Sequence, residues 1–202
     1  MNFTAKDIAL LSDTEFFAAK ATLSPKIRRL LEQIHESFQR ELTAHRLLAP
    51  DDFDPGACQF VKGEHLEDFP YQYLDYPRFF TRDVKFSFRS LVWWGHYMVF
   101  ALIVEGGHLR RYKENLINRF PSVADRDLRL CLSHSPWEWK QGPGYTLEIT
   151  RGRSSEVAAV LAHRPFFKLA RFVPFSDPAI RSGESHHLAH QTLLAVLPVI
   201  TE

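Results

Sequence analysis

Cysteine, net charge and long apolar runs are all scarce in this sequence of 202 residues. Its two cysteines, Cys58 and Cys131, form no Cys-x-x-Cys motif, which indicates thiols in a reducing compartment rather than a disulfide framework. The formal net charge is +1, without the basic excess that phosphate contacts require of a dedicated nucleic-acid binder. The longest apolar stretch, residues 91–104, is broken by Gly95 and His96 and falls short of the ~20 residues of a membrane helix.

These absences predict a cytoplasmic protein that binds neither nucleic acid nor membrane. The first residues lack a basic segment followed by a long apolar run, so no secretory signal is expected. Aromatic residues, in contrast, are plentiful, with 17 Phe and 4 Trp. Because bulky rings bury much surface per residue, we expect an aromatic-rich core. The length is that of one domain, so we expect residues 1–202 to form a single domain.

Apolar residues recur at helical spacing near both ends of the chain. A short helix is expected to begin after Thr4, and a second short helix is expected to be capped by Ser12 or Asp13. The pair Ser24-Pro25, a hydroxyl cap followed by proline, predicts the start of a long amphipathic helix that ends near Leu48. Further helices are predicted over residues 108–120, from Ser154 or Ser155 to about residue 163, and over residues 183–199.

Strand patterns fill the middle of the chain. Alternating apolar residues over 84–94, a turn at Gly95-His96 and an apolar run over 97–104 predict a central hairpin. Other strands are expected over residues 58–61, 128–132 and 166–175, with a second hairpin formed by residues 137–140 and 145–149. The Pro-interrupted segment 65–82 is expected to be irregular. Helices at both ends around antiparallel strands predict an α+β fold.

Several short motifs fall in the same order along the chain as in a known family. They are Phe3-Thr4-Ala5-Lys6-Asp7, residues 91–105, Leu116-Ile117 with Phe120-Pro121, Ser182-Gly183 and residues 193–198. With them the chain resembles the YktB-like family of small, uncharacterised bacterial proteins over nearly its whole length. Ala5, residues 71–82 and residues 142–149 depart from the family's pattern. The resemblance implies an α+β fold and offers no catalytic residue to carry over, because its motifs consist mostly of core and turn residues.

A tyrosine- and arginine-rich segment leads into the central hairpin. Its candidate ligand-binding residues are Tyr71, Tyr73, Tyr76, Arg82, Lys85 and Arg89. Aromatic walls with a few convergent charges describe a small-ligand pocket, and Lys85 and Arg89 should share one strand face. The alternative is that the arginines stack on exposed rings and pair with Glu67, Asp68, Asp75 or Asp83.

A second candidate is an anion site at residues 150–155. Free backbone N–H groups and the dipole at a helix start favour an anion there, and Arg151, Arg153 and Ser154 add donors. The segment is not a P-loop, because the Gly-Lys-Ser/Thr ending is missing. The alternative is a capped helix with solvated arginines.

Histidines cluster in the last predicted helix, at His186, His187 and His190. His186 and His190 are four residues apart and share a helix face, but a closed zinc site takes four ligands. We therefore expect no bound metal, and no cofactor is expected. The sequence contains no nucleophile elbow, metalloprotease helix, dinucleotide-binding turn or thioredoxin motif.

Three functions remain open at this point. The first is a binding module that takes a small anionic or planar ligand, or a protein partner, at the aromatic, Arg-containing region. The second is an enzyme on a small anionic substrate, with Arg89 and Arg153 as charge clamps and a histidine as acid–base group. The third is an interaction protein without a pocket, in which the predicted helix 25–48 supplies the face of a homodimer.

Overall fold

The structure is a computed structural model that describes residues 2–202. The strands are β1 (Gln59–Leu66), β2 (Phe69–Phe80), β3 (Lys85–Trp93), β4 (Tyr97–Glu105), β5 (Arg129–Cys131), β6 (Thr146–Glu148) and β7 (Phe166–Pro174). Within the described residues they form one antiparallel, seven-stranded sheet in the order β1-β2-β3-β4-β7-β5-β6. Helices lie at both ends of the chain, which confirms the predicted α+β fold.

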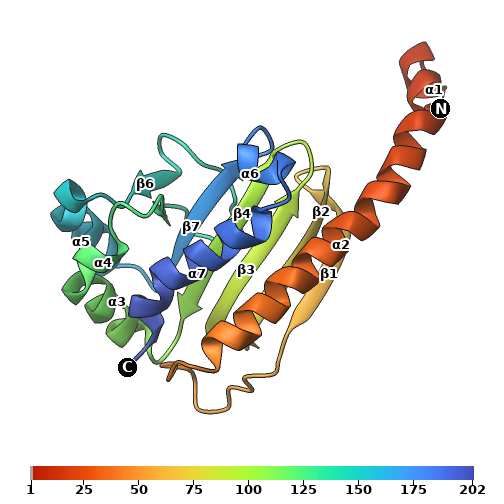
Figure 1. The fold of residues 1–202 in the computed structure, drawn as a ribbon. Coiled ribbons are helices and arrows are strands. Elements are labelled where there is room, and N and C mark those ends of the chain that lie inside the picture. The colour runs from red at the N-terminus through yellow and green to blue at the C-terminus, as the bar shows by residue number, and fades with distance from the viewer. Residues whose placement is uncertain (1) are drawn as a thin grey trace.

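The helices are α1 (Ala5–Leu11), α2 (Thr14–Leu42), α3 (Leu109–Asn118), α4 (Phe120–Val123), α5 (Ser154–Ala162), α6 (Pro178–Arg181) and α7 (Ser185–Ile200), with the 3₁₀ turn η1 (Arg151–Arg153) before α5. Figure 1 shows α2 and α7 side by side across one face of the sheet, the helix-covered face, while α1 and the first turns of α2 extend beyond the sheet. None of the described helices combines the length and the apolarity that crossing a bilayer requires.

The long helix α2 begins earlier than predicted. Asp13 caps it by accepting a hydrogen bond from the Phe16 N–H at 2.8 Å, and Pro25 lies inside the helix. The expected start at Ser24-Pro25 was therefore wrong. A Ser-Pro pair can start a helix, but it can also lie inside a helix that begins earlier in the chain. In the second case the proline, which has no N–H, leaves out one main-chain hydrogen bond. The core-facing residues nevertheless recur at helical spacing, and they are Ile27, Leu31, Ile34, Phe38 and Leu42.

The central hairpin is confirmed as β3 and β4. The two strands pair in register without a bulge, for example Phe88 with Leu102, and Gly95 in the turn has a φ of 74°, a conformation that glycine adopts without strain. Even-numbered residues of both strands contact the helix-covered core, and odd-numbered residues face the other side of the sheet. The hairpin thus divides its side chains between two separate cores.

Two strand predictions were wrong. Residues 69–80 form a full strand rather than an irregular segment, with a register shift between Asp75 and Arg78 that accommodates Pro77. Residues 137–140 form no strand, because β6 pairs with β5 instead. They belong to a loop, residues 132–145, that covers the second face of the sheet and packs Trp139 against it. We call this second side the loop-covered face.

Candidate functional site

A cavity of about 250 Å³ lies on the loop-covered face, between the loop and strands β2 and β3. Its walls are aromatic and aliphatic, and a single arginine reaches it. The lining residues are Leu66, Tyr71, Tyr73, Arg89, Leu91, Trp137 and Trp139. We call this cavity the aromatic pocket.

Strand alternation brings the two tyrosines to the same wall. Tyr71 and Tyr73 are two residues apart in β2, and their rings are parallel, with centroids 6.0 Å apart. Gly63 of β1 pairs with Tyr71, and a Cβ added to Gly63 would come within 2.4 Å of the Tyr71 ring. This close approach therefore requires glycine at position 63.

Arg89 is fixed by an ion pair at the inner end of the pocket. Its Nε and one terminal nitrogen each donate to a carboxylate oxygen of Asp75 at 2.7 Å, and Asp75 is fully buried. The guanidinium carbon lies 3.8 Å from the centroid of the Tyr73 ring. A guanidinium has five N–H groups, so two are used by Asp75, and the described residues supply no acceptor for the others.

The loop that carries the two tryptophans is attached to β7. Lys168 is fully buried, and its ammonium donates to the main-chain carbonyl oxygens of Pro136 and Glu138, the former at 2.9 Å. The same ammonium lies 3.8 Å from the centroid of a Trp139 ring. Arg164 donates in the same way to the carbonyl oxygens of the loop's first residues, Leu132 and Ser133. Two cations thus hold the loop through its main chain.

Burial shifts the acid–base behaviour of several groups on this face. Desolvation lowers the pKa of Lys168 to about 8, because removing water penalises the charged ammonium. Burial also raises the pKa of Tyr73, so its phenol is neutral at physiological pH. Shifted groups gathered around a cavity are typical of functional sites.

The structure brings together only part of the predicted ligand set. Tyr71, Tyr73 and Arg89 line the aromatic pocket. Tyr76 lies on the opposite face, where its ring contacts His35 of α2 at a centroid distance of 4.6 Å, because residue 76 has the other parity in strand β2. Arg82 is exposed in the turn between β2 and β3.

Lys85 shares a face with Arg89, as predicted, but it forms an ion pair with Glu105 at the far end of β3 and does not line the pocket.

The predicted anion site is a separate place on the molecule. Arg151 and Arg153 lie in η1 and Ser154 begins α5, and none of the three lines the aromatic pocket. Both arginines already have acidic neighbours, since Arg151 contacts Asp125 at 3.2 Å and Arg153 contacts Glu156 at 3.7 Å. Anion binding at this segment stays a prediction.

The histidines of α7 face α2. The His190 ring lies 2.9 Å from a carboxylate oxygen of Glu41, which also contacts His45 at 3.0 Å. The rings of His186 and His187 lie with their centroids 4.0 Å apart and are tilted by 37° to each other. Within residues 2–202, no three His, Cys, Asp or Glu side chains are grouped so as to hold a metal ion.

Sequence reasoning missed three residues that build the pocket: Trp137, Trp139 and Lys168. Asp75 was expected only as one of four possible carboxylate partners of the arginines, and it does pair with Arg89, whose guanidinium also lies over the Tyr73 ring. The alternation Trp137-Glu138-Trp139 was visible in the sequence, but its contact with β3 depends on a loop that crosses the sheet.

Comparison of the chain with protein-family models, with curated proteins and with solved structures finds no match. The resemblance to the YktB-like family therefore stays a prediction.

Proposed function

We propose that this protein is a binding module for a small planar ligand that carries an anionic or hydrogen-bond-accepting group, and that the ligand binds in the aromatic pocket. The pocket volume of about 250 Å³ is just below the ~300–1,000 Å³ of typical small-molecule sites. A single substituted aromatic ring fits that size better than a nucleotide.

The orientation of Arg89 carries the proposal. Asp75 and Tyr73 hold the guanidinium in one position, and the N–H groups that Asp75 does not use remain available to a carboxylate or carbonyl oxygen. A planar ligand would then contact the rings of Trp137 and Tyr71. Because the arginine is already fixed, little of its side-chain entropy is lost on binding.

The enzyme alternative receives less support. Its two proposed charge clamps, Arg89 and Arg153, belong to different parts of the molecule, and none of the described lining residues of the aromatic pocket is a histidine. A binding role needs only the fixed arginine and the rings.

Binding of benzoate, benzamide and cyclohexanecarboxylate, measured by calorimetry, tests the proposal. Benzoate should bind most tightly, because it alone combines a flat ring with a charge for Arg89. Trp137→Ala should weaken benzoate binding about fivefold, since an aromatic contact contributes roughly 0.5–1.5 kcal/mol. Trp137 is 43% exposed, so this variant should fold normally.

Tyr145→Ala is the matched control, because Tyr145 is a similarly exposed ring of the same loop outside the pocket. It should leave benzoate binding unchanged. Equal affinity for benzoate and cyclohexanecarboxylate, or equal losses in the two variants, would contradict a planar-ligand site.

A further inference from the structure

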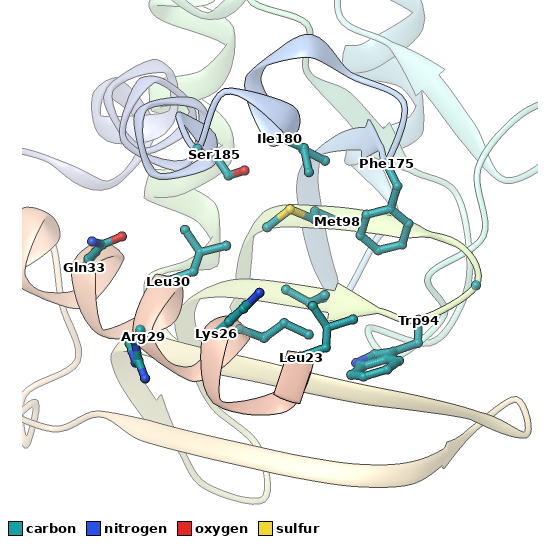
Figure 2. Close-up of a pocket in the computed structure, with 14 residues that line it drawn as sticks. Leu23, Lys26, Arg29, Leu30, Gln33, Trp94, Met98, Phe175, Ile180 and Ser185 are labelled. Atoms are coloured by element: carbon teal, nitrogen blue, oxygen red, sulfur yellow. The ribbon is translucent and has the colours of Figure 1, made fainter. Parts of the chain in front are cut away.

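A second and larger cavity lies on the helix-covered face. Its volume is about 640 Å³, well within the range of small-molecule sites. Figure 2 shows it between α2, the β3–β4 turn and the segment that joins β7 to α7. We call it the α2–α7 cleft. It shares no lining residue with the aromatic pocket.

The walls of the cleft are apolar and partly open to solvent. Val92 and Met98 of the central hairpin form its floor, with Trp94 beside them. Leu23 and Phe175 stand on opposite sides and are 44% and 41% exposed. Water therefore reaches apolar surface that a ligand with an apolar body would cover.

The polar side chains that line the cleft are two cations, one amide and one hydroxyl, namely Lys26, Arg29, Gln33 and Ser185. Lys26 and Arg29 line it, and within residues 2–202 neither has an acidic partner. Figure 2 shows the Lys26 side chain pointing toward the cavity and that of Arg29 pointing away. The lining contains no Asp or Glu among the described residues, and Glu184, the nearest acid in sequence to the start of α7, is not part of it.

Ser185 adds a buried polar group. It is only 4% exposed, yet its hydroxyl forms no hydrogen bond within the described chain and points to the cavity side in Figure 2. Ser185 is also the first residue of α7, a helix of 16 residues whose N-terminus has no side-chain cap. The uncapped N–H groups and the helix dipole favour an anion at this end.

We infer that the α2–α7 cleft binds an amphiphile with an apolar chain and one anionic head group, a carboxylate or a phosphate. The chain lies along Trp94, Met98 and Phe175. The head group lies between the Lys26 ammonium and the Ser185 hydroxyl at the start of α7. This site is additional to the aromatic pocket and does not depend on it.

The probes for a titration calorimetry test are dodecanoate, kept below the concentration at which it forms micelles, and dodecanol, kept below its solubility limit. Dodecanoate should bind saturably at one molecule per chain, and dodecanol, which lacks the charge, about tenfold more weakly. Lys26→Glu should lower dodecanoate affinity at least about tenfold and leave dodecanol affinity unchanged. Ser185→Ala should weaken dodecanoate alone.

Arg111→Glu is the matched control, because it makes the same change of charge at an exposed cation of α3 that lies outside the cleft and forms no ion pair within residues 2–202. It should change neither affinity. Thermal unfolding of each variant verifies that it is folded.

Equal losses in Lys26→Glu and Arg111→Glu, or equal affinities for the two probes, would overturn the anionic head-group site. Absence of saturable binding would overturn the whole inference. A concentration-dependent dimer in that same sample, weakened by Lys26→Glu and not by Arg111→Glu, would then identify a second copy of the chain as the occupant of the cleft.

Discussion

Lys168 is a fully buried lysine in the middle of the sheet, with two main-chain carbonyl oxygens as hydrogen-bond acceptors. Burying an ammonium is costly unless it is well hydrogen-bonded. Both acceptors belong to the loop, so the hydrogen bonds that offset the cost of burying the ammonium also hold the loop over the aromatic pocket. A hydrophobic residue at position 168 would fill the same space but would form no hydrogen bond to the loop.

The lowered pKa of Lys168 predicts a pH dependence of stability. Between pH about 8 and the ordinary lysine value of 10.5, the unfolded chain keeps a proton that the folded protein has lost. The free energy of unfolding attributable to Lys168 should therefore rise with pH across this window, by at most about 1.4 kcal/mol per pH unit, and be constant below it. Urea unfolding of the natural protein and of Lys168→Met at pH 7.5, 8.5 and 9.5 measures this difference.

Comparison with Lys168→Met is needed because other buried groups titrate with the opposite sign. Burial raises the pKa of Cys131 to about 11 and that of Tyr97 to about 12, so both lower stability as the pH rises above their unfolded values. Tyr97 is common to both proteins, and its contribution cancels in the difference. The Lys168 charge lowers the pKa of Cys131, so its removal can only raise that pKa further, and the folded-state thiol stays largely protonated up to pH 9.5 in both proteins. A difference that stays constant from pH 7.5 to 9.5 would mean that Lys168 keeps an ordinary pKa.

Single residues were predictable from the sequence where strand alternation decides their position. Tyr71, Tyr73 and Arg89 were predicted as ligand residues and do line one pocket. Tyr76 was not separated from them, because residues 65–82 were not recognised as strand. Asp75 was named as a possible partner of the arginines, and it pairs with Arg89 across strands β2 and β3. Trp139 was not predicted as a pocket residue, because its position depends on a loop that packs against a distant part of the sheet.

At the scale of elements, the central hairpin was predicted best, because its apolar pattern and its turn residues indicate the same structure. Alternating apolar residues, a Gly-containing turn and a second apolar run all specify β3 and β4. The start of α2 was mispredicted because Ser24-Pro25 carries the same local signal whether a helix begins there or passes through. Asp13 was predicted as a possible cap, but of a separate short helix, whereas the structure has one continuous helix from Thr14 to Leu42.

The hairpin's role in the core gives a direct stability prediction. Phe100 of β4 is fully buried against the helix-covered core, so Phe100→Ala should cost about 3–5 kcal/mol through lost burial and the cavity it leaves. Phe16→Ala is the control, because Phe16 is 51% exposed in α2, and its change should stay within about 0.5 kcal/mol. Urea midpoints measure both. An unchanged midpoint for Phe100→Ala would remove this strand from the core.

At the scale of the whole molecule, the N-terminal arm, residues 2–18, stands apart from the rest. α1 buries no residue, and the first buried residue of α2 is Ile27. The arm is nevertheless apolar in part, and its exposed large side chains are Phe3, Ile8, Leu10, Leu11, Phe16 and Phe17. Figure 1 shows it extending past the edge of the sheet.

Because the arm buries nothing within its own chain, deleting residues 1–18 should change the free energy of unfolding by less than about 1 kcal/mol. Urea unfolding at several protein concentrations tests this. A full-length protein that becomes more stable than the truncated one as concentration rises would instead show that the arm packs against a second copy. That result would support the homodimer alternative.

The attachment of the loop through its main chain has a consequence for how the protein can evolve. Lys168 and Arg164 bind carbonyl oxygens of residues 132, 133, 136 and 138, and every residue type supplies such an oxygen. Substitutions at these four positions therefore leave both anchors in place. Replacement of exposed Trp137 alters the wall of the aromatic pocket without removing a bond that holds the loop. The ligand preference of the pocket can therefore change during evolution while the hydrogen bonds that fix the loop over the sheet are kept.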